Sequence, residues 1–322
     1  MQVPGEVLEK FAATLLEAAG VDPAEASRLA AILVWADAVG RTEQGLQRLP
    51  ILIERFERGL IRSPADGAWS ESGATAHLDA GDGFGHLAAD RAVDRAIQLA
   101  GQYSMGLVTV AGSNYFGAAG FYAARIADAG LVGLVVSNSF PKVNAPGGTG
   151  PVLGTNPLAF AAPLNDGAPL LVDLATSTLA GSDVRRRAGA GETLEQESLQ
   201  HFGGSKGFGI ALLVEVLAGV LAGAAMGDEL GSLYSSWDQS GRNGHALLAF
   251  APRPGIDLQS RMATLADLVA ASGGRLPGAE RWKILADSRR DGVSLGERRV
   301  APLRTLAERL GVEVPMSMRS ES

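Results

Sequence analysis

Hydrophobic residues in the first sixty positions recur at intervals of three and four, the spacing that places side chains on one face of an α-helix. The pattern predicts a helix over residues 4–20, a second that runs to about Val39, and a third from near Gln44 to Gly59. The stretch "DPAE" at residues 22–25 begins the second helix with an N-cap aspartate, a proline and a glutamate placed for a capping box. We therefore expect the N-terminal part of the chain to form a helical layer.

After residue 70 the pattern changes to short apolar runs that alternate with amphipathic segments. Strands are predicted at 74–80, 106–112, 131–139, 157–164, 169–176 and 245–252, and helices at 87–103, 117–129, 207–225, 257–271 and 301–311. Because only a short turn separates the runs 157–164 and 169–176, these two strands should pair antiparallel. The pattern therefore predicts an α/β fold and favours antiparallel pairing over a doubly wound sheet.

The most apolar part of the chain, residues 210–225, is too short to cross a bilayer, which takes roughly 20 apolar residues. It is interrupted by Glu215 and is expected to be a buried helix. The first residues show no basic segment followed by an apolar one, so no signal peptide is predicted. We therefore expect a cytoplasmic protein with no membrane partner.

The composition excludes several classes of site. A formal net charge of −7 without a dense Lys/Arg run argues against a nucleic-acid partner. The chain has no cysteine, which excludes disulfides, thiolate metal sites and a cysteine nucleophile. Its four histidines, His77, His86, His201 and His245, show no metal-ligand spacing. We therefore expect structural roles for the histidines, and we predict no metal site.

The common cofactor motifs are missing, because no G-x-G-x-x-G joins a strand to a helix and there is no P-loop. Three glycine-rich segments remain: "GSNYFGAAG" at 112–120, "GGTGPVLGTNP" at 147–157 and "GGSKGFG" at 203–209. The third opens a predicted helix, whose N-terminus suits a phosphate or carboxylate, and Lys206 adds a positive charge there. A solvated lysine in a loop fits the spacing equally well.

Seven stretches, in order from end to end, resemble the malate/L-lactate dehydrogenase family that lacks a Rossmann fold. They are "GLQRLPILIERFERGLI" (45–61), "GSNYFGAAGFYA" (112–123), "VVSNSFP" (135–141), "PVLGTNPLAFAAP" (151–163), "LVDLATST" (171–178), "GGSKGFGIALLVEVLAGVLAGA" (203–224) and "RLPGAERW" (275–282). This family includes sulfolactate, ureidoglycolate and diketogulonate oxidoreductases and the piperideine-2-carboxylate and pyrroline-2-carboxylate reductases. The resemblance covers nearly the whole chain.

The resemblance implies a layered α/β fold, with a mostly antiparallel sheet that binds NAD(P) without a Rossmann motif. It also implies a homodimer with its active sites at the interface. On this basis residues 1–70 and 257–322 are expected to form the helical layer and the dimer and substrate-side elements. Residues 71–256 are expected to form the α/β cofactor-binding core.

The resemblance also implies the site residues. The cofactor would be bound by Leu153, Gly154, Thr155, Asp173, Leu174, Ala175, Thr176, Ser177, Ser205, Lys206, Gly207, Gly278 and Glu280. Arg48 matches the arginine that holds the substrate carboxylate, a task that suits the two parallel N–H donors of a guanidinium. Either NAD or NADP fits. Ser177, Arg185 and Arg186 would suit a 2′-phosphate and lean slightly to NADP, although a solvated loop also explains the arginines.

The chain departs from the family at two positions that bear on proton transfer. Where the family usually carries histidines, in "SHG" and "NHFG", this sequence has Gln44 and Tyr115. An amide can only hydrogen-bond, whereas a tyrosine can donate a proton, with a reference pKa of about 10. To serve as a base as well, Tyr115 would need a nearby cation, for which Lys142 and Lys206 are the candidates.

Three interpretations follow. In the first, Tyr115 replaces the imidazole and the enzyme acts on 2-oxo or 2-hydroxy acids. In the second, the substrate is a cyclic or N-substituted imine beside a carboxylate, which needs no strong acid. In the third, redox activity is lost and the dimer binds or regulates; the intact cofactor segments count against it. We therefore predict an NAD(P)H-dependent oxidoreductase of small 2-oxo or 2-imino carboxylates, with Arg48 on the carboxylate and Tyr115 and Gln44 at the reacting face.

Overall fold

The computed structural model describes residues 1–164, 167–179 and 200–319. Its centre is a seven-stranded sheet, which runs in the order β2 (Ala68–Ser72), β3 (Thr75–Asp79), β4 (Met105–Ser113), β10 (Asn243–Phe250), β5 (Val132–Ser137), β8 (Leu158–Ala162) and β9 (Leu170–Leu174). Neighbouring strands are antiparallel except β3 and β4, which are parallel. The predicted α/β fold with a mostly antiparallel sheet is thus confirmed, including the β8–β9 pair.

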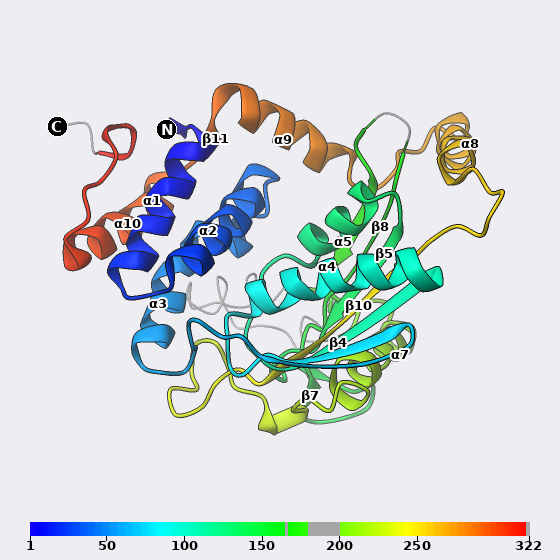
Figure 1. The fold of residues 1–322 in the computed structure, drawn as a ribbon, viewed down its shortest axis with the longest axis horizontal. Helices are drawn as coiled ribbons and strands as arrows, with labels where there is room; N and C mark the ends of the chain where they lie inside the picture. The colour runs from blue at the N-terminus through cyan, green and yellow to red at the C-terminus, as the bar shows by residue number, and fades with distance from the viewer. Residues whose placement is uncertain (165–166, 180–199, 320–322) are drawn as a thin grey trace.

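Helices cover both faces of the sheet (Figure 1). On one face lie α4 (Gly85–Tyr103) and α5 (Ala119–Asp128), and their apolar residues join Val108, Val135 and Leu247 in the main core. On the other face α7 (Ser205–Glu215) packs Val214 against Val136 and Ala246. The strand β10 is buried on both sides, which explains why its sequence "HALLAF" is apolar without alternation.

The ends of the chain form a group of helices beside the sheet. It contains α1 (Gly5–Ala18), α2 (Pro23–Ala38), α3 (Leu49–Glu57), α9 (Ala279–Asp291) and α10 (Glu297–Leu310). The short strands β1 (Gln2–Val3) and β11 (Val293–Ser294) pair and tie the first residues to this group. In contrast, α8 (Leu258–Ala271) has no buried residue and stands on the opposite side of the view from α1 and α10 (Figure 1). Further short elements include β6 (Val143–Asn144), β7 (Pro151–Leu153), η5 (Gly227–Glu229) and η6 (Met316–Met318).

The predicted capping box at α2 is completed by a third side chain. The Asp22 carboxylate accepts hydrogen bonds from the backbone of Ala24 and Glu25, as an N-cap should. Glu25, however, does not reach the backbone N–H of Asp22. That N–H donates to the Ser63 hydroxyl at 3.0 Å, and the hydroxyl donates to Glu25 at 2.6 Å. The chain after α3 is thereby fastened to the start of α2.

The third helix begins later than its apolar spacing predicted. Residues Thr42–Gln44 and Leu46–Arg48 form two 3₁₀ turns, and α3 starts at Leu49. Gly45 interrupts the helix with φ −90° and ψ −148°, and a Cβ there would lie 2.3 Å from the Asp37 carboxylate. That carboxylate also accepts the Leu46 backbone N–H at 2.7 Å. Gln44 and Arg48 are therefore carried by turns rather than by one helical face.

The prediction of a buried helix at 207–225 was wrong for its outer face. α7 ends at Glu215 and a π-helical turn, η4 (Val216–Val220), follows. Five large apolar side chains of this segment are 42 to 58% exposed: Leu212, Leu213, Val216, Val220 and Leu221. The segment is apolar all round, yet a single chain covers only the side that faces the sheet. Within the described ranges, no helix combines the length and apolarity needed to cross a bilayer.

Candidate active site

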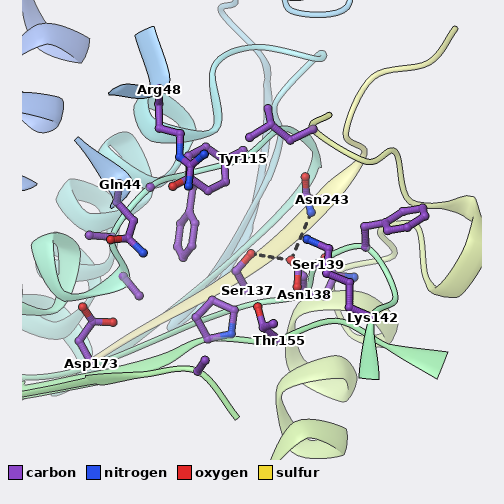
Figure 2. A pocket seen from close by; sticks show the side chains of 18 of the residues that line it. Gln44, Arg48, Tyr115, Ser137, Asn138, Ser139, Lys142, Thr155, Asp173 and Asn243 are labelled. Carbon is purple, nitrogen blue, oxygen red and sulfur yellow. Dashed lines mark hydrogen bonds between the residues drawn. The ribbon is translucent and has the colours of Figure 1, made fainter. Parts of the chain in front are cut away.

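A cavity with about 1070 Å³ of space, its open mouth included, is bounded by segments far apart in the sequence (Figure 2). Its wall includes every residue predicted to act on the substrate and several of those predicted to bind the cofactor: Gln44, Arg48, Tyr115, Lys142, Thr155, Asp173, Leu174 and Ala175. The size matches a small-molecule site.

The strand order explains why polar residues gather here. Because β10 is antiparallel to both β4 and β5, its first residue, Asn243, lies at the ends of those strands. Tyr115 follows the end of β4, Ser137 is the last residue of β5, and Asn138 and Ser139 come directly after it. Beneath them His245 contacts the hydroxyls of Ser113 at 2.8 Å and Ser137 at 2.9 Å. Burial lowers the pKa of His245 to about 3, so this imidazole is neutral and holds the strand ends together.

Arg48 is the main positive group of the cavity. Its side chain is only 7% exposed, and its guanidinium carbon lies 5.6 Å from the ring centre of Tyr115 and 5.5 Å from that of Tyr234. In the described part of the chain no carboxylate pairs with it, and its buried Nε has no hydrogen-bond partner. A buried charge of this kind is costly unless an opposite charge joins it. The arrangement therefore suits an anionic ligand.

Two further polar groups in the wall have no partner among the described residues. The Tyr115 hydroxyl and the Gln44 amide oxygen are buried and make no hydrogen bond. The Tyr115 ring contacts the Arg48 guanidinium and packs at 76° to the ring of His86, whose centre is 5.5 Å away. Each orphaned group is suited to a hydrogen bond with a bound molecule.

The cation nearest to Tyr115 differs from those considered from the sequence. Lys206 is exposed at the start of α7 and does not line the cavity. Lys142 does line it, but on the opposite side of the view from Gln44 and Arg48 (Figure 2). Arg48 itself supplies the positive charge beside the phenol ring. Sequence reasoning missed this because it assigned Arg48 to the carboxylate alone.

Asp173 is neutralised by two arginines that the sequence did not single out. Arg281 approaches its carboxylate at 3.1 Å and Arg41 at 3.4 Å, and both also donate to its backbone carbonyl. Burial, the largest effect, lowers the pKa of Arg281. Arg41 and Asp173 line the cavity, whereas Arg281 supports them from α9. Asp173 lies on the opposite side of the view from Lys142 (Figure 2).

The "LGTNP" loop is held to the cavity by a buried carboxylate. Glu215 accepts hydrogen bonds from the amides of Asn156 at 2.8 Å and Asn138 at 3.2 Å. Burial raises the pKa of Glu215. Only glycine fits at position 154, because a Cβ there would lie 2.2 Å from the Ser139 carbonyl oxygen. Thr155 is thus presented to the cavity.

Other predicted cofactor residues lie away from the cavity wall. Leu153, Gly154, Thr176 and Ser177 are behind it, Ser205, Lys206 and Gly207 are at the start of α7, and Gly278 and Glu280 are at the start of α9. Two of the glycines allow close packing of the backbone. A Cβ at Gly278, whose φ is +95°, would lie 2.9 Å from the Leu171 carbonyl oxygen, and a Cβ at Gly207 would lie 1.9 Å from that of Phe202. Arg185 and Arg186 lie outside the described residues. A role for these outer residues in cofactor binding stays a prediction.

The cavity wall contains no histidine among the described residues. His86 lies behind Tyr115, completely buried, and burial lowers its pKa to about 3. His201 contacts the Thr176 carbonyl at 3.1 Å, and His77 contacts the Thr109 hydroxyl at 2.9 Å. Imidazolium chemistry at the cavity is therefore not supplied by these side chains.

Comparisons with known proteins agree with this architecture. A sequence profile described as malate/L-lactate dehydrogenase matches residues 3–200 and 190–304. A (2R)-3-sulfolactate dehydrogenase (NADP(+)) of Chromohalobacter salexigens is 33% identical, over 93% of this chain and 96% of its own.

Two solved structures have the same fold. The malate dehydrogenase of Pyrococcus horikoshii superimposes with a TM-score of 0.87 at 26% identity, over 97% of this chain and 96% of its own. The delta1-piperideine-2-carboxylate reductase of Pseudomonas syringae pvar. tomato gives 0.87 at 28% identity, over 95% of this chain and 100% of its own. With its sequence matched along nearly its whole length and its fold shared, the chain belongs to the malate/L-lactate dehydrogenase family.

Proposed function

We propose that this protein is an NAD(P)H-dependent oxidoreductase that reduces a small 2-oxo or 2-imino carboxylate. The observation that carries the proposal is Arg48, a buried guanidinium without an acidic partner among the described residues, beside the orphaned Tyr115 hydroxyl and Gln44 amide. Membership of a family of dehydrogenases and reductases supports the same reaction class. An anion site flanked by a proton donor and an amide fits a carboxylate with a reducible C=O or C=N next to it.

The residues of the opposite wall fit the nicotinamide end of the cofactor. Thr155, Leu174 and Ala175 form this wall, and the buried Ser139 hydroxyl has no partner among the described residues. Reduced nicotinamide, when bound, supplies the hydride. Both NAD and NADP remain candidates, and the NADP(+) named for the Chromohalobacter salexigens relative supports the lean to NADP.

The residues of this chain then act on the substrate. Arg48 holds the carboxylate with two parallel N–H donors, which fixes the orientation of the neighbouring carbon. The Gln44 side chain hydrogen-bonds the reacting oxygen or nitrogen. Tyr115 donates its Oη proton to a developing alkoxide, and the Arg48 charge stabilises the phenolate that remains. Lys142 completes the electropositive lining.

The two substrate classes differ in their need for Tyr115. A 2-oxo acid accepts a hydride at carbon and a proton at oxygen, so it needs a proton donor at the site. A protonated cyclic imine accepts a hydride and becomes a neutral amine without a further proton. The reductase activity named for the Pseudomonas syringae relative supports the second class, and the sulfolactate dehydrogenase supports the first.

The exposed apolar face of α7 and η4 supports a homodimer. Leu213, Val216 and Val220 are each at least half exposed, and such a patch marks an interface. A second copy of this chain is the occupant expected from the family resemblance. In the proposed organisation residues 71–256 bind the cofactor, and residues 1–70 and 257–322 supply substrate-side and dimer elements. The reductant is an intracellular coenzyme, which supports the expected cytoplasmic location.

A binding titration followed by a substrate screen tests the proposal. NADH and NADPH fluorescence is measured on addition of protein, and 2-oxo acids are then compared with cyclic 2-imino acids by the loss of reduced cofactor. We expect binding of at least one cofactor and turnover of one substrate class. Failure to bind either cofactor would instead favour a binding or regulatory protein.

A further inference from the structure

One wall of the cavity is formed by residues 231–242, here named the Tyr234 loop. Gly231, Leu233 and Tyr234 line the cavity, and the Tyr234 ring lies 5.5 Å from the Arg48 guanidinium carbon. The loop connects η5 to β10 and contains no helix or strand. Hydrogen bonds around Ser232 close a turn that contains Tyr234, and contacts with other elements fix that turn against the rest of the protein.

Arg55 of α3 makes that connection. Its side chain is completely buried, at 1% exposed, although it is not part of the cavity wall. Its guanidinium donates to four backbone carbonyls of the loop: Ser232 at 3.3 Å, Leu233 at 3.4 Å, Ser236 at 2.7 Å and Gln239 at 2.9 Å. No carboxylate of the described residues pairs with Arg55. All the hydrogen bonds observed for the Arg55 guanidinium are therefore made to this one loop.

Two further contacts show that the loop is held in one shape. The Trp237 ring contacts two guanidinium groups, with its centre 5.8 Å from the guanidinium carbon of Arg55 and 4.5 Å from that of Arg58. At the end of the loop the Gly241 backbone N–H donates to Asn114, the residue before Tyr115, at 2.8 Å. The loop is therefore fixed in its middle by Arg55 and at its end by Asn114, which lies between β4 and Tyr115.

The chemistry of the guanidinium explains why an arginine stands here. Its planar fork presents donors in several fixed directions, so one side chain can satisfy carbonyls spread over a turn. Without it, four carbonyls would face a buried space with fewer donors, and the loop would rearrange to find water. A lysine could satisfy only part of this set.

We propose that Arg55 is a positioning residue that sets substrate affinity, because it holds Tyr234 against Arg48 without contacting the substrate. This inference rests on the proposed function of the cavity. The loop fixes one side of the guanidinium that receives the carboxylate, so loosening the loop weakens substrate binding more than the chemical step.

The first test needs no substrate. Hydrogen–deuterium exchange is compared for wild type, Arg55→Met and Arg58→Met; the last is the control because Arg58 shares the helix and Trp237 but is half exposed and pairs with Glu54. We expect a much larger rise in exchange at 231–242 in Arg55→Met than in Arg58→Met, because Arg58 contributes only the ring contact with Trp237 whereas Arg55 also binds four backbone carbonyls. Arg55→Lys, which keeps the charge in case the methionine variant folds poorly, should give an intermediate rate. Wild-type exchange in both Arg55 variants overturns the proposal.

The second test measures kinetics with the acid identified by the substrate screen. We expect Arg55→Met to raise KM about tenfold while kcat changes less than about threefold, with the cofactor Kd unchanged. Adding Arg55→Met to Tyr234→Ala should cause little further loss, because both act on one contact. The proposal is overturned if the effects of Arg55→Met and Tyr234→Ala on KM add fully in the double variant, or if Arg55→Met leaves KM unchanged. If the wild-type protein reduces none of the acids, the proposed function itself is wrong. If the wild type is active and Arg55→Met has the same KM, only the role proposed for Arg55 is wrong.

Discussion

The Arg48 anion site gives the sharpest prediction, because activity and stability should respond in different ways. Arg48→Met removes a guanidinium that holds the substrate carboxylate through two charge-assisted hydrogen bonds. The loss of that fork should cost about 3 kcal/mol of transition-state binding, a fall in kcat/KM of roughly 150-fold, most of it in KM. Arg48→Lys keeps the charge but loses the fork, so it should fall about tenfold.

Stability should move little in the same variant. Arg48 is 7% exposed and has no ion pair among the described residues, so its removal leaves no buried carboxylate unpaired. The lost contacts with Tyr115 and Tyr234 are worth about 1 kcal/mol each, and relief from burying an unpaired charge offsets them.

The assays are the decrease in NAD(P)H absorbance at varied substrate and thermal unfolding without ligand. Arg41→Met is a useful comparison, because Arg41 lines the same cavity but is already paired with Asp173. An unchanged KM together with a fall in Tm of many degrees in Arg48→Met would refute the anion-site interpretation and make Arg48 a structural residue.

Three further predictions use other parts of the molecule. Tyr115→Phe should lower kcat for a 2-oxo acid by about a hundredfold or more but leave cyclic-imine reduction near wild type; equal losses on both would remove the proton-donor role. Leu213→Glu should dissociate the dimer in sedimentation velocity, whereas Met316→Glu, at a residue 83% exposed elsewhere, should not; a monomeric wild type contradicts this. Burial, the largest effect, raises the pKa of Asp37 from 3.8 to about 6. The folded state thus holds this proton more tightly than the unfolded chain, so the contribution of Asp37 to stability is full below about pH 4 and is lost as the pH rises to about 6. Urea unfolding of Asp37→Asn should therefore show a flatter profile across this window, and identical slopes would exclude Asp37 as the cause.

The strand β2 is exposed along its whole length and was missed. The other six strands of the sheet could be predicted because they stand out in the sequence as short apolar or alternating runs. The run "HALLAF" is one example, and it became the central strand β10. Helix α9 was missed because its pattern is weak: Leu285 is its one buried residue, and Trp282 is partly buried. The turns before α3 were predicted as part of the helix. The close approach of Gly45 to Asp37 breaks the helix there, and a contact between separate segments cannot be recognised from the local sequence pattern.

The site was predictable where a motif carries it and unpredictable where distant contacts build it. Gln44, Arg48 and Tyr115 were located through the family resemblance and Lys142 as a candidate cation for Tyr115, and the structure brings all four to one cavity. In contrast, Tyr234 lies in a loop without apolar periodicity, and its anchor Arg55 is more than 170 residues away along the chain. An arginine on a helix gives no sign in the sequence that its partners are carbonyls of such a loop.

The most direct test of the central claim follows a labelled hydride. The protein is incubated with NAD(P)H that carries deuterium at C4 of the nicotinamide and with a 2-oxo acid or a cyclic 2-imino acid, and the product is examined by mass spectrometry. We predict deuterium at the carbon next to the carboxylate with wild type, and strongly reduced transfer with Arg48→Met. Transfer to no carboxylate, or equal transfer by Arg48→Met, would contradict the account.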